Sequence, residues 1–238
     1  MIDGAVEALK ELRKRDVKIF FATNNSSQTE LAYVNKLVRM GITAKVDEIL
    51  TSGRATAKYC QSVGARRIFV VGEPGLVDTL VGEGLGVVNF NSLRVHPVEG
   101  KVDAVVAGIC RDALSYELLD SAMQCITAGA RLIGTNSDAT YPLAQGKFAP
   151  GAGTILSALA TCSGTKPTII GKPNPFMLFH ALQANQILPS ETVVVGDRID
   201  TDIMFAKAAG CTGVLVTSGV DKEAPNGTAS IGGLQELL

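Results

Sequence analysis

The chain lacks the features that mark a membrane, secreted or nucleic-acid-binding protein. It contains no tryptophan, and no apolar run approaches the roughly 18 residues that a membrane-spanning helix requires. The first 15 residues have no apolar core of the kind found in signal peptides. A net charge of −1, with dispersed basic residues, gives no electrostatic basis for binding nucleic acid or an anionic membrane. We therefore expect a cytoplasmic protein with neither nucleic acid nor membrane among its partners.

Cysteine is also scarce, and it is not arranged as a ligand set. The five cysteines are scattered singly, at Cys60, Cys110, Cys125, Cys162 and Cys211. Their number is odd and their spacing fits no metal site, so we expect reduced thiols in a reducing compartment. With 238 residues, 46% of them hydrophobic, the chain has enough material for one large domain or for a domain with a substantial insert.

Strand-like and helix-like segments alternate along the whole chain. A helix is expected over residues 5–12 and a strand over 17–22. Further strands are expected at residues 68–71, 87–90, 102–107, 131–134, 192–195 and 213–217, and further helices at 76–81, 117–128, 154–162, 175–184 and 203–209. Alternation of this kind predicts an α/β fold with doubly wound parallel sheets that helices cover on both faces.

The most informative segment is residues 196–202, which read Gly-Asp-Arg-Ile-Asp-Thr-Asp. They follow a β-branched run at residues 192–195 that predicts a fully buried strand. Asp197 and Asp202 would therefore lie at the carboxyl edge of a sheet, where α/β proteins bind ligands. Carboxylates gathered there favour a cation, and hard oxygen ligands suit magnesium.

A simpler interpretation is that Asp200 or Thr201 only caps the helix expected at 203–209. A cap would explain one polar residue, but not the Gly-Asp-Arg sequence in front of it. The metal site is therefore the interpretation that we prefer.

Two further motifs suit a phosphate group. Thr23, Asn24 and Asn25 follow an expected strand, and they offer a hydroxyl and backbone amides that can cradle an anion. Alone, they are more typical of an ordinary turn before a helix. Lys172 lies between Gly171 and Pro173 and, alone, is an ordinary surface lysine. Together with a cation site, these groups supply the charge stabilisation that phosphoryl transfer needs.

The three segments resemble motifs II, III and IV of the haloacid dehalogenase superfamily. The subfamily resembled is the NagD-like, p-nitrophenylphosphatase-type class IIA, which carries an α/β cap between motifs II and III. Residues 134–138 and 150–154 resemble its cap segments. The resemblance implies a core formed by residues 1–53 and 166–238 with a cap at 54–165, because the phosphate-type motifs flank that stretch. It also implies a homodimer that forms through the cap.

The resemblance further implies a magnesium-dependent phosphatase that acts on a small phosphorylated metabolite through an aspartyl-phosphate. Thr23, Asn24 and Asn25 would bind the phosphoryl group, and Lys172 would neutralise it. Asp197 would be the main Mg²⁺ ligand, with Asp202 second, orienting the site or its waters. Substrate choice would lie in the cap, where Asn136, Asp138 and the loop at 144–151 are candidate rim residues.

The first motif of this family, Asp-x-Asp-Gly at the end of a buried strand, does not occur in the chain. Asp3-Gly4 has only two residues before it, too few for such a strand, so we do not expect Asp3 to be catalytic. Either the sequence is truncated, which we prefer, or the protein is a natural variant that has lost its chemistry. The second case predicts a non-catalytic phospholigand-binding or scaffolding protein. A Rossmann-type nucleotide enzyme is disfavoured because the fingerprint Gly-x-Gly-x-x-Gly is missing.

Overall fold

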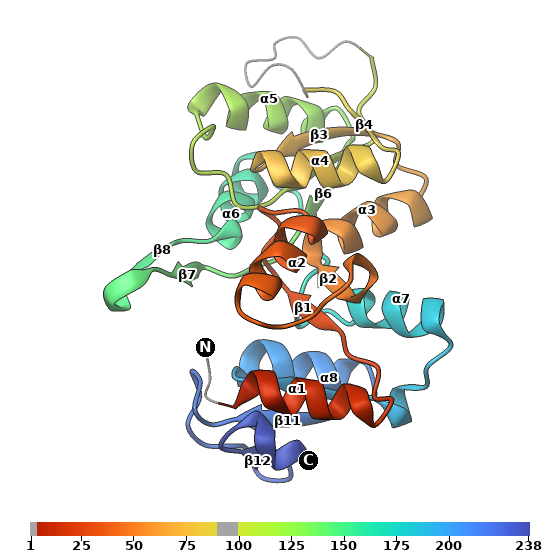
Figure 1. The fold of residues 1–238 in the computed structure, drawn as a ribbon. Coiled ribbons are helices and arrows are strands. Elements are labelled where there is room, and N and C mark those ends of the chain that lie inside the picture. The colour runs from red at the N-terminus through yellow and green to blue at the C-terminus, as the bar shows by residue number, and fades with distance from the viewer. Residues whose placement is uncertain (1–3, 90–99) are drawn as a thin grey trace. The chain divides into compact units, whose positions relative to one another are not determined.

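Helices and strands alternate in the computed structural model, which describes residues 4–89 and 100–238 (Figure 1). The ladders of the three-stranded and five-stranded sheets are all parallel, so the expected α/β class is confirmed. Asp3 and the end of the strand expected at 87–90 lie outside the described residues. The chain forms two compact units. Unit 1 comprises residues 1–22, 30–50 and 172–238, and unit 2 comprises 23–29 and 51–171.

Unit 2 is built on a five-stranded parallel sheet with the order β4-β3-β5-β6-β9. The strands are β3 (Arg67–Val71), β4 (Gly86–Val87), β5 (Ala104–Ala107), β6 (Arg131–Gly134) and β9 (Thr168–Ile169). Every residue of β5 is buried because β3 and β6 pair with it on its two sides. Strands with neighbours on both sides and helices on both faces read as continuous apolar runs, as this one does.

Helices α5 (Tyr116–Thr127) and α6 (Ala152–Ser163) pack together over this sheet. Their buried side chains form one core with alternate residues of the strands, among them Phe69, Val71, Val105, Leu118, Leu132, Leu156 and Leu159. Helices α3 (Ser52–Ser62) and α4 (Pro74–Gly82) also pack against each other within this unit. Leu76 of α4 lies over Gly72 and Gly108, where a larger residue would collide with it.

An antiparallel hairpin of β7 (Thr140–Pro142) and β8 (Phe148–Pro150) was not expected from the sequence. Its turn places Gln145 and Gly146 in the left-handed region, with φ of +60° and +71°. Each strand is only three residues long, so no alternating apolar pattern was available to predict it. Residues 144–151, expected as a loop, thus include the turn and the second strand of this hairpin.

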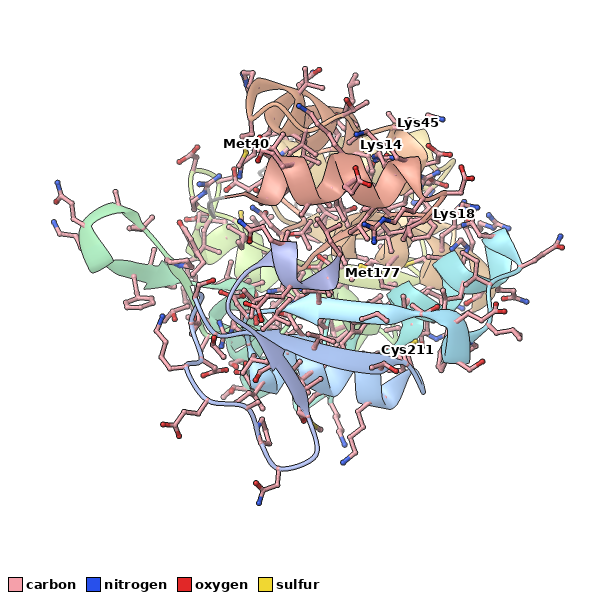
Figure 2. The ribbon with its side chains drawn as sticks, turned by 60° about the horizontal axis from the view of Figure 1, so that its bottom comes forward. Lys14, Lys18, Met40, Lys45, Met177 and Cys211 are labelled. Carbon is pink, nitrogen blue, oxygen red and sulfur yellow. The ribbon has the colours of Figure 1, made fainter. Side chains whose placement is uncertain are left out.

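Unit 1 contains a three-stranded parallel sheet with the order β10-β11-β12. Its strands are β10 (Val193–Gly196), β11 (Thr212–Val216) and β12 (Ala229–Ile231). Its helices are α1 (Ala5–Lys14), α2 (Glu30–Arg39), α7 (Phe176–Asn185) and α8 (Met204–Ala208). Figure 2 shows the strands between α1 on one side and α8 on the other, with Cys211 just before β11. Helix α7 buries Met177, and α8 buries Phe205.

A separate two-stranded sheet pairs β1 (Phe21–Thr23) with β2 (Ile49–Thr51). Each of these strands begins in unit 1, and its last residue is grouped with unit 2. The strand expected over 17–22 is therefore largely wrong, since only its end is a strand and Val17 is 44% exposed. A strand with one short partner has few backbone hydrogen bonds to extend it.

The expectation of a fully buried strand at residues 192–195 is also wrong. β10 is exposed at Val193 and only half-buried at its other three residues. Among the described residues it pairs with β11 alone, so its second edge has no ladder. The β-branched composition predicted the strand correctly, but burial also depends on a second neighbour, which the composition does not supply.

None of the helices in residues 4–89 and 100–238 is both long enough and apolar enough to cross a membrane.

Candidate functional site

The segment after β10 folds back so that a carboxylate and a lysine meet. One π-helical turn (Ile199–Ile203) leads from Arg198 into α8 and carries Asp202, which is only 7% exposed. Lys172 Nζ donates to Asp202 Oδ1 over 2.6 Å. The backbone N–H groups of Asp197 and Arg198 donate to Asp202 Oδ2, each over 3.2 Å. The fold therefore brings Lys172 and Asp202 together, although 30 positions separate them.

Asp197, the first carboxylate of this segment, lies at the carboxyl end of β10. Its Oδ2 accepts the backbone N–H of Val220 over 3.1 Å. A Cβ at Gly219 would overlap the Asp197 side chain, and a Cβ at Gly196 would overlap that of Asp202. Glycine is required at both positions because the backbone approaches each carboxylate so closely.

The simpler capping interpretation is wrong for this segment. The π-helical turn has no side-chain cap, and Thr201 is buried. Asp200 is exposed and instead forms an ion pair with Arg198 over 2.8 Å. Asp221 does bond to the start of the turn, where its Oδ2 accepts the backbone N–H of Ile199 over 2.7 Å. Sequence reasoning missed Asp221 because it lies 22 positions from Ile199 in an unremarkable polar stretch.

These donors fit a magnesium ion in part. Within the described ranges, no group of three or more His, Cys, Asp or Glu side chains could hold a metal by itself. Mg²⁺, however, is commonly bound by one or two carboxylates together with water and substrate phosphate oxygens. Asp197 offers a carboxylate of the right chemistry. Asp202 is already bonded through both oxygens, to Lys172 and to two amides, which suits an orienting role.

The loop that carries Thr23, Asn24 and Asn25 belongs to unit 2. Thr23 Oγ1 accepts the backbone N–H of Asn25 over 3.2 Å, and Asn25 Oδ1 accepts that of Ser27 over 2.8 Å. The hydroxyl of Ser52 donates to the Asn24 carbonyl over 2.6 Å. These short-range bonds define the loop, as Asx and Ser/Thr turns do. The other three predicted site residues, Lys172, Asp197 and Asp202, belong to unit 1.

A chain of polar contacts ties this loop to the end of β6. Ser26 Oγ lies 3.1 Å from Thr135 Oγ1, which donates to Asn136 Oδ1 over 3.0 Å. Asp138 Oδ2 then accepts two side-chain amides, from Asn136 over 2.7 Å and from Asn24 over 3.1 Å. All five residues lie within unit 2. Because this network is partly buried and well paired, it holds the loop in one conformation.

A cavity of about 100 Å³ opens beside this network. It is lined by Asn24, Asn25, Ser27, Ile109, Arg111, Asn136, Asp138, Tyr141 and Gly151, which all belong to unit 2. Asn136, Asp138 and Gly151 were expected near a substrate. Arg111 and Tyr141 were not, because neither lies in a motif that the sequence made recognisable.

Known proteins resemble this chain over most of its length. The sequence profile of haloacid dehalogenase-like hydrolases matches residues 1–86, and a HAD-hydrolase-like profile matches 169–232. The acid sugar phosphatase of Staphylococcus epidermidis is 34% identical over 220 residues, which cover 92% of this chain and 81% of that protein.

Solved structures agree with the sequence comparisons. A double mutant of a thermostable NPPase from Geobacillus stearothermophilus superposes with a TM-score of 0.88 at 33% identity, covering 99% of this chain and 92% of that one. NagD from E. coli K-12 gives a TM-score of 0.85 at 28% identity, covering 99% and 90%. The chain therefore belongs to the haloacid dehalogenase superfamily, as a class IIA, NagD-like phosphatase.

Proposed function

We propose that this phosphatase is a magnesium-dependent phosphomonoester hydrolase that acts on a small phosphorylated metabolite through an aspartyl-phosphate. The observation that carries the proposal is the contact of Lys172 with Asp202 beside Asp197, at the carboxyl end of β10. An ammonium group and two carboxylates at a sheet edge suit a dianionic phosphoryl group that is bound together with a cation.

Each site residue has a distinct role in this proposal. Lys172 neutralises a phosphoryl oxygen, and Asp202 fixes the Lys172 ammonium group. Thr23 donates its hydroxyl to a second oxygen, and the backbone amide of Asn24, with Asn25 beside it, completes the cradle. Asp197 is the main Mg²⁺ ligand, and Asp202 orients the site as the second acidic residue. A bound Mg²⁺ would offset the charge that develops on the transferring group.

The nucleophile is the one part that none of these residues supplies. Covalent phosphoryl transfer needs a carboxylate in line with the leaving group. A strand ending in Asp-x-Asp-Gly next to the edge of β10 that has no ladder among the described residues would place such a carboxylate beside Asp197.

We also propose a division of the chain into core and cap, a cellular location and a set of binding partners. We assign residues 1–53 and 166–238 to the core and 54–165 to the cap that selects the substrate. We place the protein in the cytoplasm, as a homodimer through the cap, with no nucleic acid or membrane partner. Burial raises the pKa of Cys60 to about 12 and that of Cys110 to about 11, so both thiols stay protonated and unreactive.

Magnesium binding tests the assignment of the site. Asp197→Ala should weaken Mg²⁺ binding, measured by calorimetry in the presence of inorganic phosphate, by roughly tenfold or more. Asp200→Ala is the matched control because it removes the same charge from an exposed neighbour, and it should change the affinity less than twofold. If Asp197→Ala bound Mg²⁺ as tightly as the parent chain, the metal site would have been assigned to the wrong residue.

A further inference from the structure

The cavity in unit 2 is lined by one cation, Arg111, whose backbone and side chain both bond to Glu73. Glu73, which is 7% exposed, accepts both the backbone N–H of Arg111 over 2.6 Å and its side-chain Nε over 3.3 Å. The N–H of Glu73 donates to the carbonyl of Ile109 over 2.9 Å. Burial raises the pKa of Glu73, but the Arg111 bonds outweigh it and hold that pKa below its usual value. Glu73 is therefore ionised, and it neutralises the charge of Arg111.

The other charge lining the cavity is the carboxylate of Asp138. Its Oδ2 accepts the amides of Asn24 and Asn136, and in the part of the chain that the structure describes it forms no ion pair with a cation. Because Glu73 already balances Arg111, Asp138 leaves this cavity with an excess of one negative charge. An anionic group of a ligand in this cavity would lie close to the Asp138 carboxylate, and the repulsion between the two negative charges would be unfavourable.

A neutral hydroxylated group would match the same set of side chains. Hydroxyls both donate and accept, so they can donate to Asp138 and accept from the guanidinium of Arg111 and the side-chain amides. The volume of about 100 Å³ is well below the roughly 300–1,000 Å³ of pockets that enclose a whole drug-sized ligand. The cavity therefore suits a small substituent of a ligand, not a complete aromatic or nucleotide group.

We propose that this cavity receives the leaving group of the substrate, and that Arg111 and Asp138 select a small neutral polyol over an acidic group of similar size. Arg111, held by Glu73, donates to the hydroxyls, and Asp138 accepts from them and disfavours a carboxylate. Asn24 links this selection to the phosphate loop because its backbone belongs to the loop and its side chain bonds to Asp138. The inference rests on the proposed function, since it takes the phosphate of the same ligand to lie at that loop.

Ligand binding to the 238-residue chain tests the inference without requiring turnover. Three probes are compared by calorimetry with Mg²⁺ present: inorganic phosphate, glycerol 3-phosphate and phosphoglycolate. We expect glycerol 3-phosphate to bind about tenfold more tightly than phosphoglycolate. Asp138→Asn should remove most of this difference by tightening phosphoglycolate binding. Asp78→Asn, which removes the same charge from an exposed site on α4, should leave the difference intact.

A second pair of variants tests the cation. Arg111→Gln should weaken glycerol 3-phosphate about fivefold while leaving inorganic phosphate within twofold. Arg66→Gln, at an exposed arginine of the same unit that does not line the cavity, should change neither. If inorganic phosphate does not bind at all, the proposed function is wrong and the inference falls with it. If phosphate binds but the two organic probes bind equally, or if Asp138→Asn and Arg111→Gln act no differently from their controls, only the inference is overturned.

Discussion

The two units contain similar strands that are buried to different extents. β5 in unit 2 and β10 in unit 1 are both four residues long, rich in valine and parallel to their neighbours, yet β5 is fully buried and β10 is not. β5 lies between β3 and β6, whereas β10 pairs only with β11 in the described part of the chain. The comparison teaches that a strand's composition sets its tendency to be buried, while its neighbours decide whether it is.

The largest expected effect comes from giving β10 a second neighbour. We predict that the chain as given shows negligible hydrolysis of p-nitrophenyl phosphate. A designed N-terminal extension that carries a hydrophobic strand ending in Asp-x-Asp-Gly should raise magnesium-dependent turnover by roughly 10⁴-fold or more, because it supplies the nucleophile. It should also slow hydrogen exchange of the β10 amides, so that the protection of β10 becomes more similar to that of β5.

The matched control replaces the first aspartate of the extension with asparagine. This variant should protect the β10 amides to the same extent while leaving turnover negligible, which separates the strand from its chemistry. Robust magnesium-dependent turnover by the chain as given, abolished by Asp3→Asn, would instead show that Asp3 is catalytic and that the first motif has been misplaced.

A smaller effect distinguishes the two strands by substitution alone. Val106→Ala, in the middle of β5, should destabilise unit 2 by about 2 kcal/mol, because it leaves a cavity among fully buried side chains. Val193→Ala on β10, where the side chain is 54% exposed, should cost less than about 0.5 kcal/mol. Urea unfolding followed by residue-resolved hydrogen exchange measures both costs. Equal costs would mean that the edge of β10 is covered in solution.

The smallest effect concerns an ion pair that belongs to unit 1 alone. Arg13 on α1 binds both carboxylate oxygens of Glu48 over 2.7 Å, and its hydrogen bond is the main reason that the pKa of Glu48 is lowered. Arg13→Gln should therefore destabilise unit 1 by about 0.5–1 kcal/mol at pH 7 and leave unit 2 unchanged.

The pH dependence of this effect has a definite sign. A carboxyl whose pKa is lower in the folded state stabilises the fold above the pKa of the unfolded chain, and this stabilisation is lost as the pH falls through the folded value. The difference between parent and Arg13→Gln should therefore start to shrink as the pH falls below the usual glutamate pKa of about 4.3, and it should vanish only below the lowered pKa of the folded state. A difference in denaturant midpoint that does not shrink between pH 5 and pH 3 would contradict the prediction.

Sequence reasoning predicted the local elements of this fold better than their surroundings. The helices at 117–128 and 154–162 and the strand at 131–134 were found within a few residues, because their apolar periodicity is a property of the segment itself. The burial of β10 and the length of β1 were not, because both depend on which strand lies alongside. The β7–β8 hairpin was missed because its strands are too short to show a pattern.

For the candidate site, the sequence indicated the residues but not their bonds. Spacing alone could show that Asp197 and Asp202 flank one turn, yet not that Asp202 would bond to Lys172 and to two backbone amides. Arg111 could not be predicted at all, since its importance comes from Glu73, which is 38 positions away in the sequence. Long-range pairings of this kind are set by the fold, not by local pattern.

The position of β9 has a consequence for protein engineering. This strand completes the sheet of unit 2 by pairing with β6, and the N–H of Gly171 just beyond it donates to the Thr135 carbonyl over 2.8 Å. The next residue after Gly171 is Lys172 of the candidate site. A chimera that exchanges the middle of the chain between related proteins should therefore be joined after Gly171, because a junction at residue 165 would pair β9 of one parent with β6 of the other.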